Sequence, residues 1–136
     1  MNSNSSTVKW EEKELEKISF AEGVNVKKLK QLLGAGRVVI PKNANRAEKR
    51  AITLKAIGAG MSMKVNVNVG TSKDYVSVEE EVRKAKVAVE YGADAIMDLS
   101  TGGDLNETRR TILKEVDVPV GTVPIYQAAL EKANVR

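Results

Sequence analysis

The first 60 residues carry hydrophobic side chains at helical spacing, which predicts two short helices. Within residues 8–22, Leu15 and Ile18 fall on one face, and Gly23 is a typical helix stop. A second helix is expected to begin after Asn25, whose side-chain oxygen can accept a hydrogen bond from a free amide of the first turn. Leucines at helical spacing continue this second pattern. This part of the chain is therefore predicted to be mainly helical.

A short β-like stretch and a further helix are predicted before residue 60. The segment Arg37-Val-Val-Ile-Pro41 is apolar and closed by proline, which is typical of a short strand. Residues Ala47–Ile57 predict a helix, although several of them are β-branched and lose side-chain freedom in a helix. The glycines of Gly58-Ala-Gly60 then mark a boundary, so we expect two domains, residues 1–60 and 61–136.

Strands and helices alternate after Gly60. Ser77 and Asp104 each precede a glutamate by three residues, an arrangement that satisfies free amides at a helix start, and Pro124 suits the first turn of a last helix. The predicted strands between these helices are Met63–Val69, Ala95–Leu99 and Val118–Val123. The alternation predicts β/α units in a parallel sheet, and both an open doubly wound sheet and a closed eight-stranded barrel fit it.

Four side chains stand where these strands end, which is where parallel sheets of both kinds bind ligands. Asn66 and Asn68 alternate with valines and share one face of the first strand, which suits either solvent or a ligand. Met97 follows Asn68 by 29 residues, and Tyr126 follows Met97 by 29 residues, which predicts comparable heights in successive units. We expect Asn68, Met97 and Tyr126 to converge on one small-molecule site, with Asn66 as a further candidate.

Two polar loops lie at the same strand ends, Gly70-Thr-Ser72 and Ser100-Thr-Gly-Gly103. Free amides in such loops can bind a phosphate near a helix start. The glycine spacing of a phosphate-binding motif is missing, however, and an ordinary tight connection fits equally well, so the phosphate-binding residues stay unknown. Asp98 is expected to orient a ligand or a lysine, and Asp94 to cap the entry of its strand.

The sequence contains no cysteine and no histidine, which limits the chemistry open to it. It has no thiolate for catalysis or for an iron–sulfur cluster, and it lacks the commonest metal ligand. Any chemistry of this chain alone would have to use carboxylates, lysine, tyrosine or the hydroxyls of serine and threonine. We assign no catalytic residue and no metal ligand to this chain.

Charge and hydropathy argue against nucleic acid and membrane as partners. The net charge is +4 and only 4% of residues are aromatic, whereas nucleic-acid binding favours a concentrated basic patch, often with stacking platforms. No signal-peptide pattern is present, and no apolar stretch approaches the roughly 20 residues of a membrane helix. A cytoplasmic location is expected.

Four segments have a distinctive sequence: Gly36-Arg-Val-Val-Ile-Pro-Lys-Asn43, Val65-Asn-Val-Asn-Val-Gly-Thr-Ser72, Gly92-Ala-Asp-Ala-Ile-Met-Asp-Leu-Ser-Thr-Gly102 and Pro119-Val-Gly-Thr-Val-Pro-Ile-Tyr-Gln-Ala128. In content, order and spacing they resemble the phosphomethylpyrimidine synthase family of thiamine biosynthesis, over roughly residues 23–133. The chain departs from the family pattern at Val67, where alanine is usual. It also departs at Arg46-Ala-Glu-Lys49, where the family runs through histidine and proline.

The resemblance implies an α/β fold with a small N-terminal helical and β region, followed by the first three β/α units of a (β/α)8 barrel that is incomplete as a single chain. It implies that Asn68, Met97 and Tyr126, and more weakly Asn66, bind aminoimidazole ribotide. The family enzyme is a radical S-adenosylmethionine lyase that converts this ribotide into hydroxymethylpyrimidine phosphate. It uses a 4Fe-4S cluster, S-adenosylmethionine and a divalent metal, none of which is expected on this chain alone.

Two functions fit these observations. The first is the N-terminal part of such a synthase, which would form a homo-oligomer or associate with the missing half of the barrel. The alternative is a non-catalytic ribotide- or phosphate-binding or assembly module derived from the family.

The isolated chain is predicted to have no synthase activity, because a cluster that splits S-adenosylmethionine needs three thiolates. Incubation with iron, sulfide, reductant, S-adenosylmethionine and ribotide should give neither a brown cluster spectrum nor a pyrimidine product. Product above a control without protein would contradict this prediction.

Overall fold

The computed structural model describes residues 10–43 and 52–133 of the 136-residue chain. Two compact units are formed, one from Met1–Ile40 with Ala56–Ser62 and the other from Pro41–Lys55 with Met63–Arg136. The division into domains 1–60 and 61–136 stays a prediction. Within the described ranges, no helix is both long and apolar enough to span a membrane.

The first unit contains helices α1 (Glu12–Glu22) and α2 (Val26–Gly34), followed by an antiparallel pair of strands, β1 (Val38–Val39) and β2 (Ile57–Gly58). Gly23 ends α1 in the left-handed region, with φ at 64°, where a residue without a Cβ has no steric penalty. The side chain of Asn25 accepts a hydrogen bond of 2.8 Å from the amide of Lys27 at the start of α2. Both predicted helix signals are therefore confirmed.

The predicted helix over Ala47–Ile57 is wrong wherever the structure describes it. Residues 47–51 lie outside the described residues, residues 52–56 form no helix, and Ile57 belongs to β2. The amide of Thr53 instead donates to the carbonyl of Asp117 at 2.9 Å, and its Oγ1 donates to the carboxylate of Asp117 at 2.6 Å. These bonds to a residue far along the chain favour an extended path, which also suits the β-branched side chains.

The second unit is built around a three-stranded parallel sheet in the order β3-β4-β5, as the alternating pattern predicted. Its strands are β3 (Asn66–Val69), β4 (Ala95–Asp98) and β5 (Val120–Thr122), and its helices are α3 (Val78–Glu90), α4 (Leu105–Glu115) and α5 (Pro124–Ala133). The side chains of Ser77 and Asp104 accept the amides of Glu80 and Glu107, so each starts its helix as expected.

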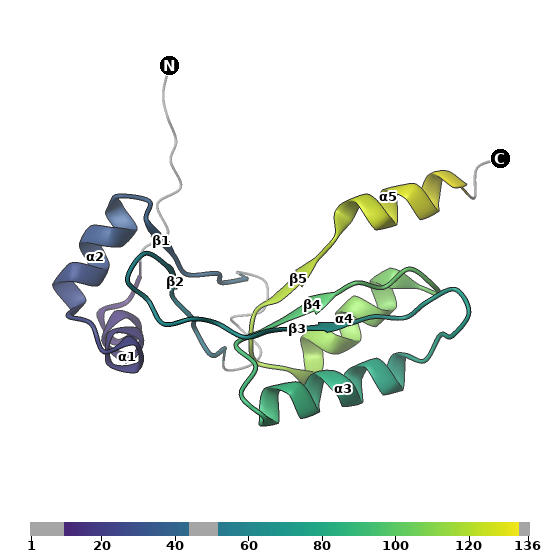
Figure 1. Cartoon of the computed structure of the whole chain (residues 1–136), viewed down its shortest axis with the longest axis horizontal. Coiled ribbons are helices and arrows are strands. Elements are labelled where there is room, and N and C mark those ends of the chain that lie inside the picture. The colour runs from purple at the N-terminus through teal and green to yellow at the C-terminus, as the bar shows by residue number, and fades with distance from the viewer. Residues whose placement is uncertain (1–9, 44–51, 134–136) are drawn as a thin grey trace, which may run out of the picture. The chain divides into compact units, whose positions relative to one another are not determined.

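Helices α3 and α4 cover one face of this sheet, whereas α5 continues outward from β5 and does not return along the strands (Figure 1). The apolar core lies between the sheet and these two helices, with Ile96 and Ile112 fully buried. On the opposite face Asn66 and Asn68 are exposed, and none of the described elements of this unit packs against them. The unit therefore has a helix-covered face and an open face.

Asp94 joins three segments at the amino ends of the strands. One carboxylate oxygen accepts from Lys55 Nζ at 2.7 Å, and the other accepts from the amide of Val65 at 2.9 Å, just before β3. Burial raises the pKa of Asp94, but the hydrogen bonds from Lys55 and Val65 outweigh it and leave the pKa below its usual value. Asp94 was expected to cap the entry of its own strand, β4, but it caps the entry of β3 instead, because its carboxylate accepts the amide of Val65.

We predict that Asp94→Asn lowers the free energy of unfolding by about 1–2 kcal/mol above pH 5, since a charged hydrogen bond is lost. The pKa is lower in the folded chain, so the stabilisation is present above the unfolded pKa of about 3.9 and is lost as pH falls through the folded value. The wild type and the variant should therefore converge below pH 4 in urea denaturation. Asp74→Asn, at an exposed position, is the matched control. A difference independent of pH would contradict the prediction.

Candidate functional site at the carboxyl ends of the parallel strands

The strand register brings two of the predicted site residues together on the open face. Asn68 is the direct neighbour of Met97, and Met97 is the direct neighbour of Gly121 on β5. Neighbouring positions in a parallel sheet point to the same face, so these three share the face that carries no helix. Asn66 lies on this face as well, one pair earlier, opposite Ala95.

The missing side chain of Gly121 makes room for the thioether of Met97. A Cβ at position 121 would lie 2.9 Å from Cε and 3.0 Å from Sδ of Met97, so the end of this side chain would have to shift. The methionine therefore lies across β5 on the open face, beside Asn68. A flexible, polarizable thioether next to an exposed amide can contact a flat heterocycle while the amide makes directional hydrogen bonds.

Tyr126 lies outside the sheet, in the first turn of α5, with 43% of its surface exposed. Its equal spacing from Met97 predicted a comparable height, but the residue of β5 level with Met97 is Gly121. The expectation of equal heights therefore holds for Asn68 and Met97 and is wrong for Tyr126, because the second β/α unit closes in fewer residues than the first. Convergence of Tyr126 with the other two stays a prediction.

The two polar loops bind each other and leave few of their amides for a phosphate. The amide of Gly70 donates to Glu81 at 2.6 Å, and the amide of Thr71 donates to Ser100 Oγ at 3.1 Å. The hydroxyl of Thr71 donates to the carbonyl of Gly102 at 2.6 Å, and the amide of Thr101 donates to the carbonyl of Thr71 at 2.8 Å. A phosphate at these amides would have to displace the bonds that join the loops.

Glycine is required where the loops touch. A Cβ on Gly102 would lie 2.3 Å from the carbonyl oxygen of Ser72, and a Cβ on Gly70 would lie 2.6 Å from the amide nitrogen of Ser100. Gly70 also has φ at 151°, a conformation that other residues rarely adopt. These two glycines are thus required by close backbone packing between the loops.

The two polar loops and the strand ends that carry them form a rim at the carboxyl edge of the sheet. Two buried carboxylates support this rim from the helix-covered face. Asp98 accepts from the amide of Ser100 at 3.0 Å and from its hydroxyl, and it shares a face with Ile96, so it does not reach the open face. Asp98 therefore orients a loop and faces an arginine, Arg109, where a lysine or a ligand was expected; a ligand contact stays a prediction. Glu81, only 2% exposed, pairs with Lys84 at 2.6 Å and holds the amide of Gly70.

Sequence reasoning missed Glu81 and Arg109, although a signal was present. Each lies on the buried, core-facing stripe of its helix, Glu81 with Ala85 in α3 and Arg109 with Ile112 in α4. A charged residue within an apolar stripe needs a buried partner, and such a partner is found at the strand ends.

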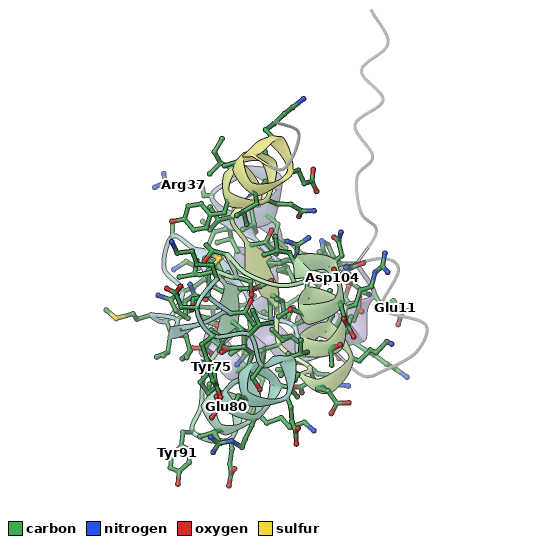
Figure 2. The ribbon with its side chains drawn as sticks, turned by 90° about the vertical axis from the view of Figure 1, so that its right-hand side faces the viewer. Glu11, Arg37, Tyr75, Glu80, Tyr91 and Asp104 are labelled. Atoms are coloured by element: carbon green, nitrogen blue, oxygen red, sulfur yellow. The ribbon has the colours of Figure 1, made fainter. Side chains whose placement is uncertain are left out.

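Near the start of α3, the exposed Tyr75 makes a polar contact with Glu80. Figure 2 shows Tyr75 beside Glu80. A hydrogen bond to the Glu80 carboxylate and its negative charge raise the pKa of Tyr75 above 10.0, so the phenol stays a donor at neutral pH.

The donor groups of a metal or cluster site are scarce in the described part of the chain. The sequence has no cysteine and no histidine, and in residues 10–43 and 52–133 no three carboxylates converge as a metal site would require. What the site can offer is hydrogen bonding and packing from the open face.

Comparison with known proteins identifies relatives over nearly the whole chain. A family model described as the Radical SAM ThiC family matches residues 4–136. Phosphomethylpyrimidine synthase of Pyrococcus abyssi is 56% identical over 114 residues, which is 84% of this chain and 26% of that protein. The enzymes of that name from Thermus thermophilus and Thermococcus kodakarensis are 52% and 54% identical, over 89% and 87% of this chain and 27% of each relative. The chain thus spans about a quarter of the length of these curated relatives.

Gly102→Ala should lower the free energy of unfolding of the sheet unit by about 1–3 kcal/mol, the usual cost of overpacking, because its Cβ would meet rigid backbone. Gly121→Ala is the matched control in the same unit, because its Cβ would meet only the movable end of Met97. The control should cost less than about 1 kcal/mol. Urea denaturation followed by circular dichroism measures both, and equal losses would refute the role of the loop contact.

Proposed function

Because the chain belongs to the Radical SAM ThiC family, we propose that it forms one part of a phosphomethylpyrimidine synthase, the enzyme of thiamine biosynthesis that converts aminoimidazole ribotide into hydroxymethylpyrimidine phosphate. Relatives of that name are more than half identical to it over most of its length. Since the chain spans only about a quarter of those proteins, its own contribution is substrate binding rather than the whole reaction.

The register of Asn68 and Met97 is the observation that supports this role. The two side chains lie next to each other on the face that carries no helix, at the carboxyl ends of parallel strands. In the proposed site the amide hydrogen-bonds ring or ribose groups, the thioether packs on the imidazole ring, and Tyr126 adds a phenol from α5. Asn66 contributes a second, more distant amide.

The cofactors of the family do not fit this chain. A 4Fe-4S cluster needs thiolates, and the sequence has none. We therefore assign the cluster, S-adenosylmethionine and the divalent metal to the part of the enzyme that this sequence does not contain, and no chemical step to the residues described here. On this proposal the chain alone binds ribotide and is inactive.

The open face and the unpaired edge of β3 support association with further barrel elements. Among residues 10–43 and 52–133, no strand pairs with the outer side of β3, and a groove along it is lined by Val65, Val87 and Tyr91, all exposed. An edge strand presents unpaired backbone amides and carbonyls, which favour pairing with another strand. A (β/α)8 barrel that closes on this edge would cover both features.

Asn68→Ala should weaken binding of aminoimidazole ribotide by about 1–3 kcal/mol, because a directional hydrogen bond is lost. Val67→Ala is the matched control, since Val67 is the adjacent residue of β3 and packs against the core on the opposite face. The control should leave the affinity unchanged and lower the free energy of unfolding by about 1–2 kcal/mol. Calorimetric titration and urea denaturation measure the two effects. Equal affinities in both variants, or no binding by the wild type, would refute the proposed site.

A further inference from the structure

A chain of polar contacts runs from the β3 loop through the end of β4 toward α5. It begins at Thr71, whose amide donates to Ser100 Oγ at 3.1 Å. Ser100 in turn donates its own amide and hydroxyl to one carboxylate oxygen of Asp98, the last residue of β4. The other carboxylate oxygen of Asp98 faces Arg109 Nε at 3.8 Å.

Arg109 extends this chain to the last helix. Its Nη2 donates to Gln127 Oε1 at 3.1 Å, which joins α4 to α5. The side-chain nitrogen Nε2 of Gln127 then donates to Glu131 Oε1 at 2.9 Å, one turn further along α5. The same nitrogen lies 3.5 Å from Asn106 Oδ1 of α4. Gln127 thus joins α5 to α4 through hydrogen bonds to two residues of that helix.

Asp98 and Arg109 form an ion pair that is largely shielded from water, so the carboxylate depends on the arginine for its compensating charge. The side chain of Asp98 is 1% exposed and that of Arg109 is 24% exposed. Arg109 Nε is itself buried and has no hydrogen-bond acceptor among the described residues. A buried carboxylate without its cation is costly, so Arg109 is held at Asp98 while its other nitrogen reaches Gln127.

Helix α5 depends on this link more than α3 or α4 depend on theirs. It has 10 residues, which is too short for a stable isolated helix in water, and it continues outward from β5 instead of packing along the sheet (Figure 1). Tyr126 immediately precedes Gln127 in its first turn. Whatever fixes Gln127 therefore also fixes the backbone that carries Tyr126.

We propose that Arg109 is a positioning residue: by bridging the buried Asp98 and Gln127, it holds α5 and so sets where Tyr126 stands relative to the rim formed by β3 and β4. The inference rests on the proposed function for the role of Tyr126. The bridge itself is a property of this chain and is testable without ligand. Arginine suits the task because its planar fork can face two acceptors at once, which a lysine ammonium at the same place does not do.

The test compares three variants by ¹⁵N relaxation of the whole chain, without ligand. Arg109→Lys keeps a cation for Asp98 but loses the bridge. Gln127→Ala breaks the bridge from the α5 side, and because alanine favours helix, any loss of order there cannot come from helix propensity. Arg110→Met is the matched control, at an exposed arginine of the same helix.

Arg109→Lys and Gln127→Ala should each lower the heteronuclear NOE of residues 125–133 toward values of an unfolded segment. The values for α3 and α4 and the midpoint of urea unfolding should stay near those of the wild type. In the same two variants, affinity for aminoimidazole ribotide should fall about fivefold, the effect of one lost hydrogen bond or contact. Arg110→Met should change neither quantity.

The outcomes separate the two proposals. If α5 keeps its wild-type order in Arg109→Lys and Gln127→Ala, or loses as much in Arg110→Met, the positioning role of Arg109 is refuted. A loss of order spread over α3 and α4 would refute it as well, since that is what a general structural role produces. If the wild type binds no ribotide, the proposed function fails, and the order of α5 still decides the role of Arg109.

Discussion

Side-chain alternation across the parallel strands is the constraint from which the rest of the second unit follows. Val67, Ile96 and Val120 are neighbours in the register and face α3 and α4, where they exclude water. The next residue of each strand must then face the other way, which places Asn68 and Met97 side by side on the open face. A slip of one residue would bury the amide and expose the core.

Two buried carboxylates, which have almost no access to water, organise the polar contacts at the carboxyl ends of the strands. Glu81 and Asp98 enter from the helix-covered face, and their oxygens are occupied by loop amides, a serine hydroxyl and cations. Because a buried carboxylate is stable only with such partners, these contacts hold the two loops in one arrangement. The carboxyl ends of the strands thus owe their shape to residues that do not reach the open face.

Local signals predicted most of the elements, because helix caps and strand alternation depend on a few adjacent residues. Asn25, Ser77 and Asp104 cap helices as expected, and the parallel sheet of three strands follows the alternation of strand and helix. The helix over Ala47–Ile57 was wrong in its described part for the opposite reason. Its path is set by hydrogen bonds from Thr53 to a residue 64 positions away, which no local pattern records.

By itself the sequence determined which side chains share a strand face, and it excluded cluster and thiolate chemistry, because these depend only on residue order and residue type. The tertiary structure decided how successive β/α units align. Met97 stands level with Gly121, not with Tyr126, since the register depends on how many residues each helix and loop consume. Arg109 meets Asp98 and Gln127 because α4 lies on the helix-covered side of the sheet while α5 leaves the sheet. Such long-range packing sets buried charge pairs, and sequence spacing does not encode it.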